Sequence, residues 1–141
     1  MRITHLDAET GITTPLGTEG MHNSMAVSPD GRWLAVTRGS GAGSEIYLVD
    51  TRTRVERRFV ESGGNLSLGM FSLDSRTLYW AGTSGDAVWW LLRQPIDGSS
   101  PVDSVTSIMD TLIPHAISAD GRHAFVAYWS RSSSWDLSLI H

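Results

Sequence analysis

Serine and histidine are the side chains of this 141-residue sequence that could act as a nucleophile and its base. The chain has no cysteine, which excludes thiol catalysis, disulfides and cysteine-ligated zinc. A hydrolase serine commonly lies in a Gly-x-Ser-x-Gly pentapeptide on a strand-to-helix turn. No such pentapeptide occurs, and the glycine and serine residues in 64–69 and 82–85 have the wrong spacing. We therefore predict no catalytic residue and no enzymatic activity for this chain.

The histidines offer no local metal site. No two of them are spaced i, i+2 or i, i+4, the spacings that bring ligands together on a strand or helix. The glycine-rich stretch 39–44 joins two apolar runs and precedes no helix, so it lacks the context of a phosphate-binding loop. We expect a hairpin there, and neither a metal nor a cofactor.

Charge and hydropathy limit the classes of partner. The net charge of −4 argues against a nucleic-acid footprint. The longest apolar run, Ala87–Leu92, is far shorter than the roughly 20 residues of a membrane helix. The first residues contain no apolar signal segment, so the default expectation is the cytoplasm. We expect neither a nucleic acid nor a membrane as partner.

A pentapeptide recurs along the chain. Ser28-Pro29-Asp30-Gly31-Arg32 returns as residues 72–76 (Ser-Leu-Asp-Ser-Arg) and 118–122 (Ser-Ala-Asp-Gly-Arg), so the aspartates lie 44 and then 46 residues apart. A second, gapless similarity aligns residues 3–12 with 46–55, and residues 90–98 fit the same frame with Gly98 in the place of Gly11. Such a period indicates a repeat architecture.

Short runs rich in Val, Ile, Trp, Tyr and Phe surround these motifs, bounded by Gly, Asp, Ser and Pro, which is typical of strands. No window holds a helical apolar stripe, so the chain is predicted to be all-β. The strands are expected at about 2–7, 12–16, 24–28, 32–38, 45–50, 55–60, 67–72, 76–82, 87–93, 102–107, 113–118, 122–129 and 135–140.

The repeated pentapeptide has the chemistry of a hairpin turn. Proline presets φ for the second position of a type I turn, glycine takes the left-handed position, and Ser and Asp oxygens bond free turn amides. Ser75 replaces that glycine at a cost of about 1 kcal/mol, so we expect its turn to be the weakest or of another type. The structural turn residues are predicted to be Ser28, Asp30, Gly31, Ser72, Asp74, Ser118, Asp120 and Gly121.

Four strands per unit at a period near 45 indicate a β-propeller. The pentapeptide resembles the WD40-like (PD40) repeat of the bacterial TolB proteins, also found in the propellers of prolyl oligopeptidase and dipeptidyl peptidase IV relatives. Residues 24–53 fit that repeat well, 112–140 with Ala119 for proline, and 68–98 loosely. The resemblance implies the fold and leaves function open.

Residues 1–141 would thus be one propeller domain or a fragment of one, with repeats at about 1–21 (partial), 22–63, 64–108 and 109–141 (partial). Its first and last residues both fall in the third strand of a blade, the four-stranded sheet of a propeller. We therefore predict a homodimer. Each chain would give the strand at 12–16 to the last blade of the other chain, and the two chains would complete a six-bladed ring. In this scheme the strand at 2–7 duplicates 135–140 and would be displaced or left unpaired.

The function predicted from these features is a non-catalytic module that binds a protein or peptide. The loops near a channel mouth nominate Asn23, Arg38 and His115 as binding residues. The alternatives are the substrate-gating propeller of an oligopeptidase-like serine peptidase without its catalytic domain, and a sensor or scaffold segment of a signalling protein.

Overall fold

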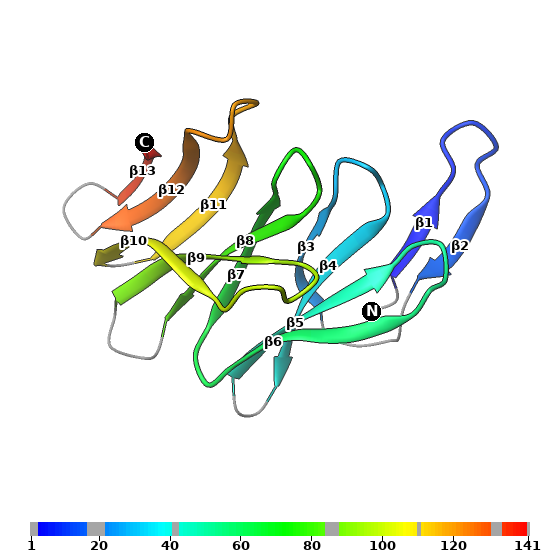
Figure 1. Ribbon diagram of the computed structural model, residues 1–141, viewed down its shortest axis with the longest axis horizontal. Coiled ribbons are helices and arrows are strands. Elements are labelled where there is room, and N and C mark those ends of the chain that lie inside the picture. The colour runs from blue at the N-terminus through cyan, green and yellow to red at the C-terminus, as the bar shows by residue number, and fades with distance from the viewer. Residues whose placement is uncertain are drawn as a thin grey trace.

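The computed structural model describes residues 3–16, 22–40, 43–83, 88–109, 111–130 and 134–140, and over these ranges the chain is a series of strands without a helix (Figure 1). The strands are β1 (Ile3–Leu6), β2 (Thr13–Leu16), β3 (His22–Val27), β4 (Trp33–Ser40), β5 (Gly43–Asp50), β6 (Glu56–Ser62), β7 (Leu66–Phe71), β8 (Thr77–Thr83), β9 (Val88–Pro95), β10 (Asp103–Met109), β11 (Leu112–Ile117), β12 (Ala124–Ser130) and β13 (Ser134–Ile140). Each coincides with a predicted strand, and the all-β prediction is confirmed. No helix that could cross a bilayer occurs in these ranges.

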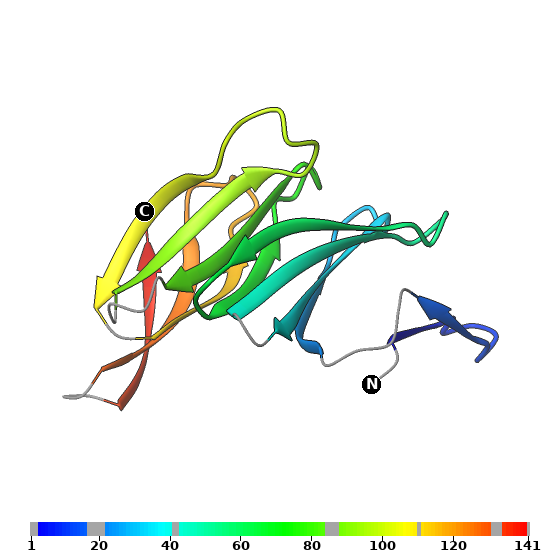
Figure 2. The ribbon, with the colours of Figure 1, turned by 90° about the horizontal axis from the view of Figure 1, so that it is seen from below.

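The strands form antiparallel sheets that follow one another along the chain. After the β1–β2 hairpin come the first sheet (β3-β4-β5-β6), the second sheet (β7-β8-β9-β10) and the third sheet (β11-β12-β13). Within each sheet the strands are adjacent in sequence order, so short hairpins connect them. The glycine-rich stretch is one of these hairpins, with Ser40 paired to Gly43. Figure 1 shows the sheets side by side, and Figure 2 shows the same row from below.

Apolar clusters lie between neighbouring sheets rather than within one. Ile3 and Leu16 of the hairpin pack on Leu34, Val36 and Val49 of the first sheet. Clusters of the same kind join the first sheet to the second (Ala35, Ile46, Leu48 with Leu68, Phe71, Leu78, Trp80) and the second to the third (Met70, Ala81, Leu91 with Leu112, Ala124, Val126). The strands must therefore be apolar on both faces, which explains their near-continuous hydrophobic runs.

The three pentapeptides form turns with the same hydrogen bonds, which we call the Asp turns. In the first, the Ser28 hydroxyl donates to Asp30 Oδ1 (2.5 Å), the same carboxylate accepts the Arg32 N–H (3.0 Å), and Ser28 Oγ accepts the Trp33 N–H (2.9 Å). The other two repeat this set from Ser72 and Ser118. All three lie along one edge of the row of sheets (Figure 1).

Ser75 takes the conformation of the glycine that it replaces. Its φ is 61°, close to the 69° of Gly31 and Gly121, and its N–H donates to the Ser72 carbonyl as Gly31 N–H does to Ser28. The expectation of another turn type is thus wrong. The Ser75 side chain is 5% exposed, and its Oγ accepts the Asp30 N–H of the neighbouring Asp turn at 3.1 Å. The Ser75 hydroxyl thus forms a hydrogen bond between two sheets that a glycine at this position could not form.

The second repeated element forms a different hairpin, between β1 and β2 and between β5 and β6. The Asp7 and Asp50 carbonyls each accept an N–H from the residue four positions later, Gly11 (φ 70°) and Arg54 (φ 61°). Asp97–Gly98 departs from this frame, because the Gly98 N–H donates to Pro95, only three residues earlier. The bond that closes the β9–β10 turn thus spans three residues rather than four, although the connection from Pro95 to Asp103 is longer than those of the other two hairpins.

Candidate functional site

The structure places two of the three predicted binding residues at strand bulges. The pairing of β3 with β4 skips Asn23, and the pairing of β11 with β12 skips His115. His115 is exposed, whereas the Asn23 side chain lies outside the described part of the chain. Gly69 is skipped at the corresponding position of β7.

Arg38, the third predicted residue, is held by its own sheet. Its guanidinium makes two bonds to the Glu56 carboxylate, at 2.6 and 2.5 Å, and lies 4.3 Å from the centre of the Tyr47 ring. The side chains of Arg38 and Glu56 are each 16% exposed. The Glu56 hydrogen bond raises the pKa of Arg38 above its ordinary value. Arg38 thus has a place in the packing of the first sheet.

A groove lies beside the first two Asp turns, between the first and second sheets. We call it the rim groove; its volume is about 860 Å³, and it is lined by Asp30, Arg32, Trp33, Arg57, Asp74, Ser75, Arg76, Ile96 and Asp97. Its lining thus comes from the Asp turns that contain Asp30 and Ser75, from Arg57 of β6 and from the start of the β9–β10 turn. Neither Arg38 nor His115 lines it.

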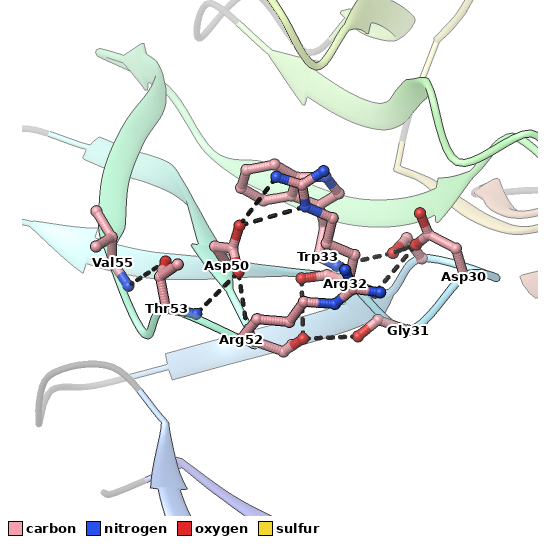
Figure 3. A network of polar contacts seen from close by, with 10 residues as sticks. Asp30, Gly31, Arg32, Trp33, Asp50, Arg52, Thr53 and Val55 are labelled. Atoms are coloured by element: carbon pink, nitrogen blue, oxygen red, sulfur yellow. Dashed lines mark hydrogen bonds and ion pairs between the residues drawn. The ribbon is translucent and has the colours of Figure 1, made fainter.

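Trp33 supplies the aromatic ring among the residues that line this groove. The guanidinium groups of Arg32 and Arg57 lie 5.2 and 5.8 Å from the centre of its ring, within the range of cation–π attraction. Arg32 also pairs with Asp50 Oδ2 at 3.3 Å (Figure 3). Arg57 reaches across the groove and donates to the Ile96 carbonyl of the second sheet. These bonds fix the groove's shape.

The rim groove carries equal numbers of opposite charges. The Ser28, Ser72 and Ser99 hydroxyls donate to Asp30, Asp74 and Asp97 and hold the pKa of each carboxyl below its ordinary value. All three are therefore anionic at neutral pH and face three arginines. Arg76 is the arginine of this set whose side chain makes no hydrogen bond or ion pair within the described ranges, although its charge contributes to the low pKa of Asp74 and Asp97.

Trp33 and Arg57 line the rim groove, and neither was among the binding residues predicted from the sequence. The neighbouring Arg58 pairs within its own sheet, with Glu45 and Glu61 at 3.2 and 3.1 Å. Arg57 instead donates to the carbonyl of Ile96, the residue that follows β9. The available signal was the recurrence of Arg32 and Arg76 beside the Asp turns.

The comparisons with known proteins address the fold. No protein-family model and no curated protein matches this sequence. Among solved structures, TolB from Acinetobacter baumannii superposes with a TM-score of 0.77 and 20% identity, over 95% of this chain and 33% of that one. The putative TolB from Agrobacterium tumefaciens gives 0.75 and 21%, over 99% and 56%. The β-propeller domain of the Trilobed protease from Pyrococcus furiosus gives 0.70 and 15%, over 99% and 45%.

This chain spans between a third and somewhat over half of the length of these structures. At such identities the likeness concerns architecture, and it agrees with the repeat found in the sequence. The predicted resemblance is thereby confirmed: the chain forms part of a β-propeller, with the fold that TolB shares with the propeller domains of several peptidases.

Proposed function

We propose that this chain is a binding module that holds a peptide segment of a partner protein in the rim groove. The observation that carries the proposal is the juxtaposition of the Trp33 ring with the free guanidinium of Arg76 in one groove. Tryptophan and arginine are the residues that most often dominate the energy of protein interfaces. A volume of about 860 Å³ also lies within the range of sites that bind small ligands or short peptide segments.

The charges of the groove favour a peptide over a phosphate polymer. Three carboxylates would repel a polyanion, whereas a peptide can present both an acidic and a basic group. Arg76 offers two parallel N–H donors to a carboxylate, a geometry that makes strong charge-assisted bonds. We therefore expect the bound segment to carry an Asp, a Glu or a terminal carboxylate facing Arg76, beside an apolar residue against Trp33 and Ile96.

The experiment is selection from a random peptide library on the immobilised chain, followed by affinity measurement for the enriched peptides. The expected sequences share an acidic residue, and Arg76→Ala weakens their binding at least tenfold. Arg52→Ala is the matched control, because Arg52 is also exposed but lies outside the groove. Enrichment without an acidic residue, or equal loss in both variants, would contradict the proposal.

A further inference from the structure

One arginine of the rim groove connects its two sides. Arg57 belongs to β6 of the first sheet, and its guanidinium donates to the carbonyl oxygen of Ile96, which follows β9 in the second sheet. The same guanidinium lies 5.8 Å from the centre of the Trp33 ring and 5.6 Å from the centre of the Phe59 ring. Trp33, Phe59 and Ile96 all pack against the apolar cluster between the two sheets, and we call them the apolar edge. Arg57 thus lies against all three of its residues.

The apolar edge is only partly open to the rim groove. Its three side chains are half-buried. Trp33 and Ile96 line the groove, whereas Phe59 does not. Arg57, which also lines the groove, lies against both rings. A movement of Arg57 away from these rings would therefore enlarge the apolar surface that the groove presents.

The repeat shows why Arg57 reaches out of its own sheet. Arg57 pairs with Leu48 across the β5–β6 hairpin. Followed through the strand pairing from the Asp turns, these two residues correspond to Asp103 and Arg93 of the second sheet. The Asp103 carboxylate is held by the Arg93 guanidinium, at 2.9 and 2.7 Å. Leu48 is apolar and fully buried, so it offers no such partner, and the guanidinium of Arg57 bonds across the groove instead.

The contacts that hold Arg57 are of a kind that a ligand can replace. Its side chain is exposed, and it makes no ion pair with any residue that the structure describes. Cation–π contacts at exposed sites are weak, and water can take the place of an exposed hydrogen bond to a carbonyl. Arg32, by contrast, is paired with Asp50. Of the two arginines beside Trp33, Arg57 is therefore the one that can move at little cost.

We propose that Arg57 is a strap that covers the apolar edge in the free chain and swings aside when a peptide segment enters the rim groove. This role rests on the peptide binding proposed above for the groove. An apolar residue of the peptide that packs on Trp33 and Ile96 competes with Arg57, because the guanidinium lies against the same two residues. Displacing the strap lowers the net affinity, so Arg57 restrains binding, whereas Arg76 promotes it.

The strap can be tested without a peptide, by acrylamide quenching of tryptophan fluorescence. We expect Arg57→Ala to raise the quenching constant, and the same change in a Trp33→Phe background to leave it unaltered, since Trp33 is the ring that becomes accessible. Arg58→Ala is the matched control, because Arg58 is also exposed on β6 and its loss removes the same charge, but it pairs with Glu45 and Glu61. An unchanged circular dichroism spectrum verifies the fold of each variant. Equal quenching in Arg57→Ala and the parent chain would overturn the proposal.

Affinity for the peptides selected on the parent chain supplies the second test. We expect Arg57→Ala to bind them at least about threefold more tightly, and Arg58→Ala to bind them as the parent chain does. Unchanged or weaker binding by Arg57→Ala would overturn the strap while leaving the proposed function intact, because Arg57 would then be neutral or a contact of the peptide. A library that yields no peptide would instead contradict the proposed function, and the quenching measurement would still decide whether Arg57 covers Trp33.

Discussion

At the residue scale, Ser75 shows how a repeat tolerates a substitution that its turn chemistry disfavours. A non-glycine residue at φ 61° is strained by about 1 kcal/mol. The bond from the Asp30 N–H to Ser75 Oγ contributes a similar amount in the opposite direction. The strain could be predicted from one turn, whereas the compensation involves residues 45 positions apart and needs the packing of two sheets.

This balance predicts the stabilities of two variants. Ser75→Ala keeps the strained backbone and loses the hydrogen bond, so its free energy of unfolding should fall by about 1 kcal/mol. Ser75→Gly loses both terms and should stay within about 0.5 kcal/mol of the parent chain. Urea denaturation of the three proteins measures the difference. The explanation fails if alanine is as stable as serine.

The same scale explains which parts of the site were predictable. The hydrogen bonds of the Asp turns involve residues within five positions of one another, so their chemistry is written in the pentapeptide. The rim groove is different, because Arg57 reaches Ile96, 39 residues away, through the angle between two sheets. No local pattern encodes that angle, and the predicted residues Asn23, Arg38 and His115 came from position in the repeat alone.

At the scale of elements, all described strands were predictable because Gly, Asp, Ser and Pro residues mark where each strand begins and ends. Their bulges were not. β7 and β11 are both bulged, at Gly69 and His115, and there the two strands approach closely. A Cβ on Gly69 would lie 2.6 Å from the Pro114 ring and 2.8 Å from the Tyr79 carbonyl oxygen. Glycine at this position thus permits the contact between the second and third sheets.

Gly69→Ala should therefore lower the free energy of unfolding by about 1–3 kcal/mol, as overpacking does in other cores. Gly63→Ala is the control, since a Cβ there meets nothing within 4 Å and its φ is unstrained. Thermal or chemical denaturation of both variants compares the two sites. Similar stability of the two would mean that the sheets can separate without cost.

At the scale of the whole molecule, the period of the repeat and the turn chemistry were enough to predict a propeller, which the solved structures confirm as a fold. Function did not follow in the same way, because binding depends on side chains that the repeat leaves free to vary. Peptidases also carry propellers of this fold, so the proposed absence of catalysis needs its own test.

We expect no covalent labelling when the purified chain is treated with a fluorophosphonate probe, which reacts with activated serines. The reason is that no serine lies in a nucleophile motif. Mass spectrometry of the intact chain measures the outcome, with a known serine hydrolase as positive control. Stoichiometric labelling of one serine would show that the chain is catalytic.

The placement of the apolar clusters between sheets determines how far the effect of a destabilising substitution spreads along the molecule. Among the described residues the buried apolar clusters all lie between sheets, so removing the first or the second sheet would break the apolar contacts on both of its sides at once. The stability of each sheet then depends chiefly on its direct neighbours, as it does in proteins built from stacked repeats. A destabilising substitution in the second sheet therefore weakens both the first and the third sheet. A substitution in the third sheet destabilises mainly the second sheet and has little effect on the β1–β2 hairpin at the other end.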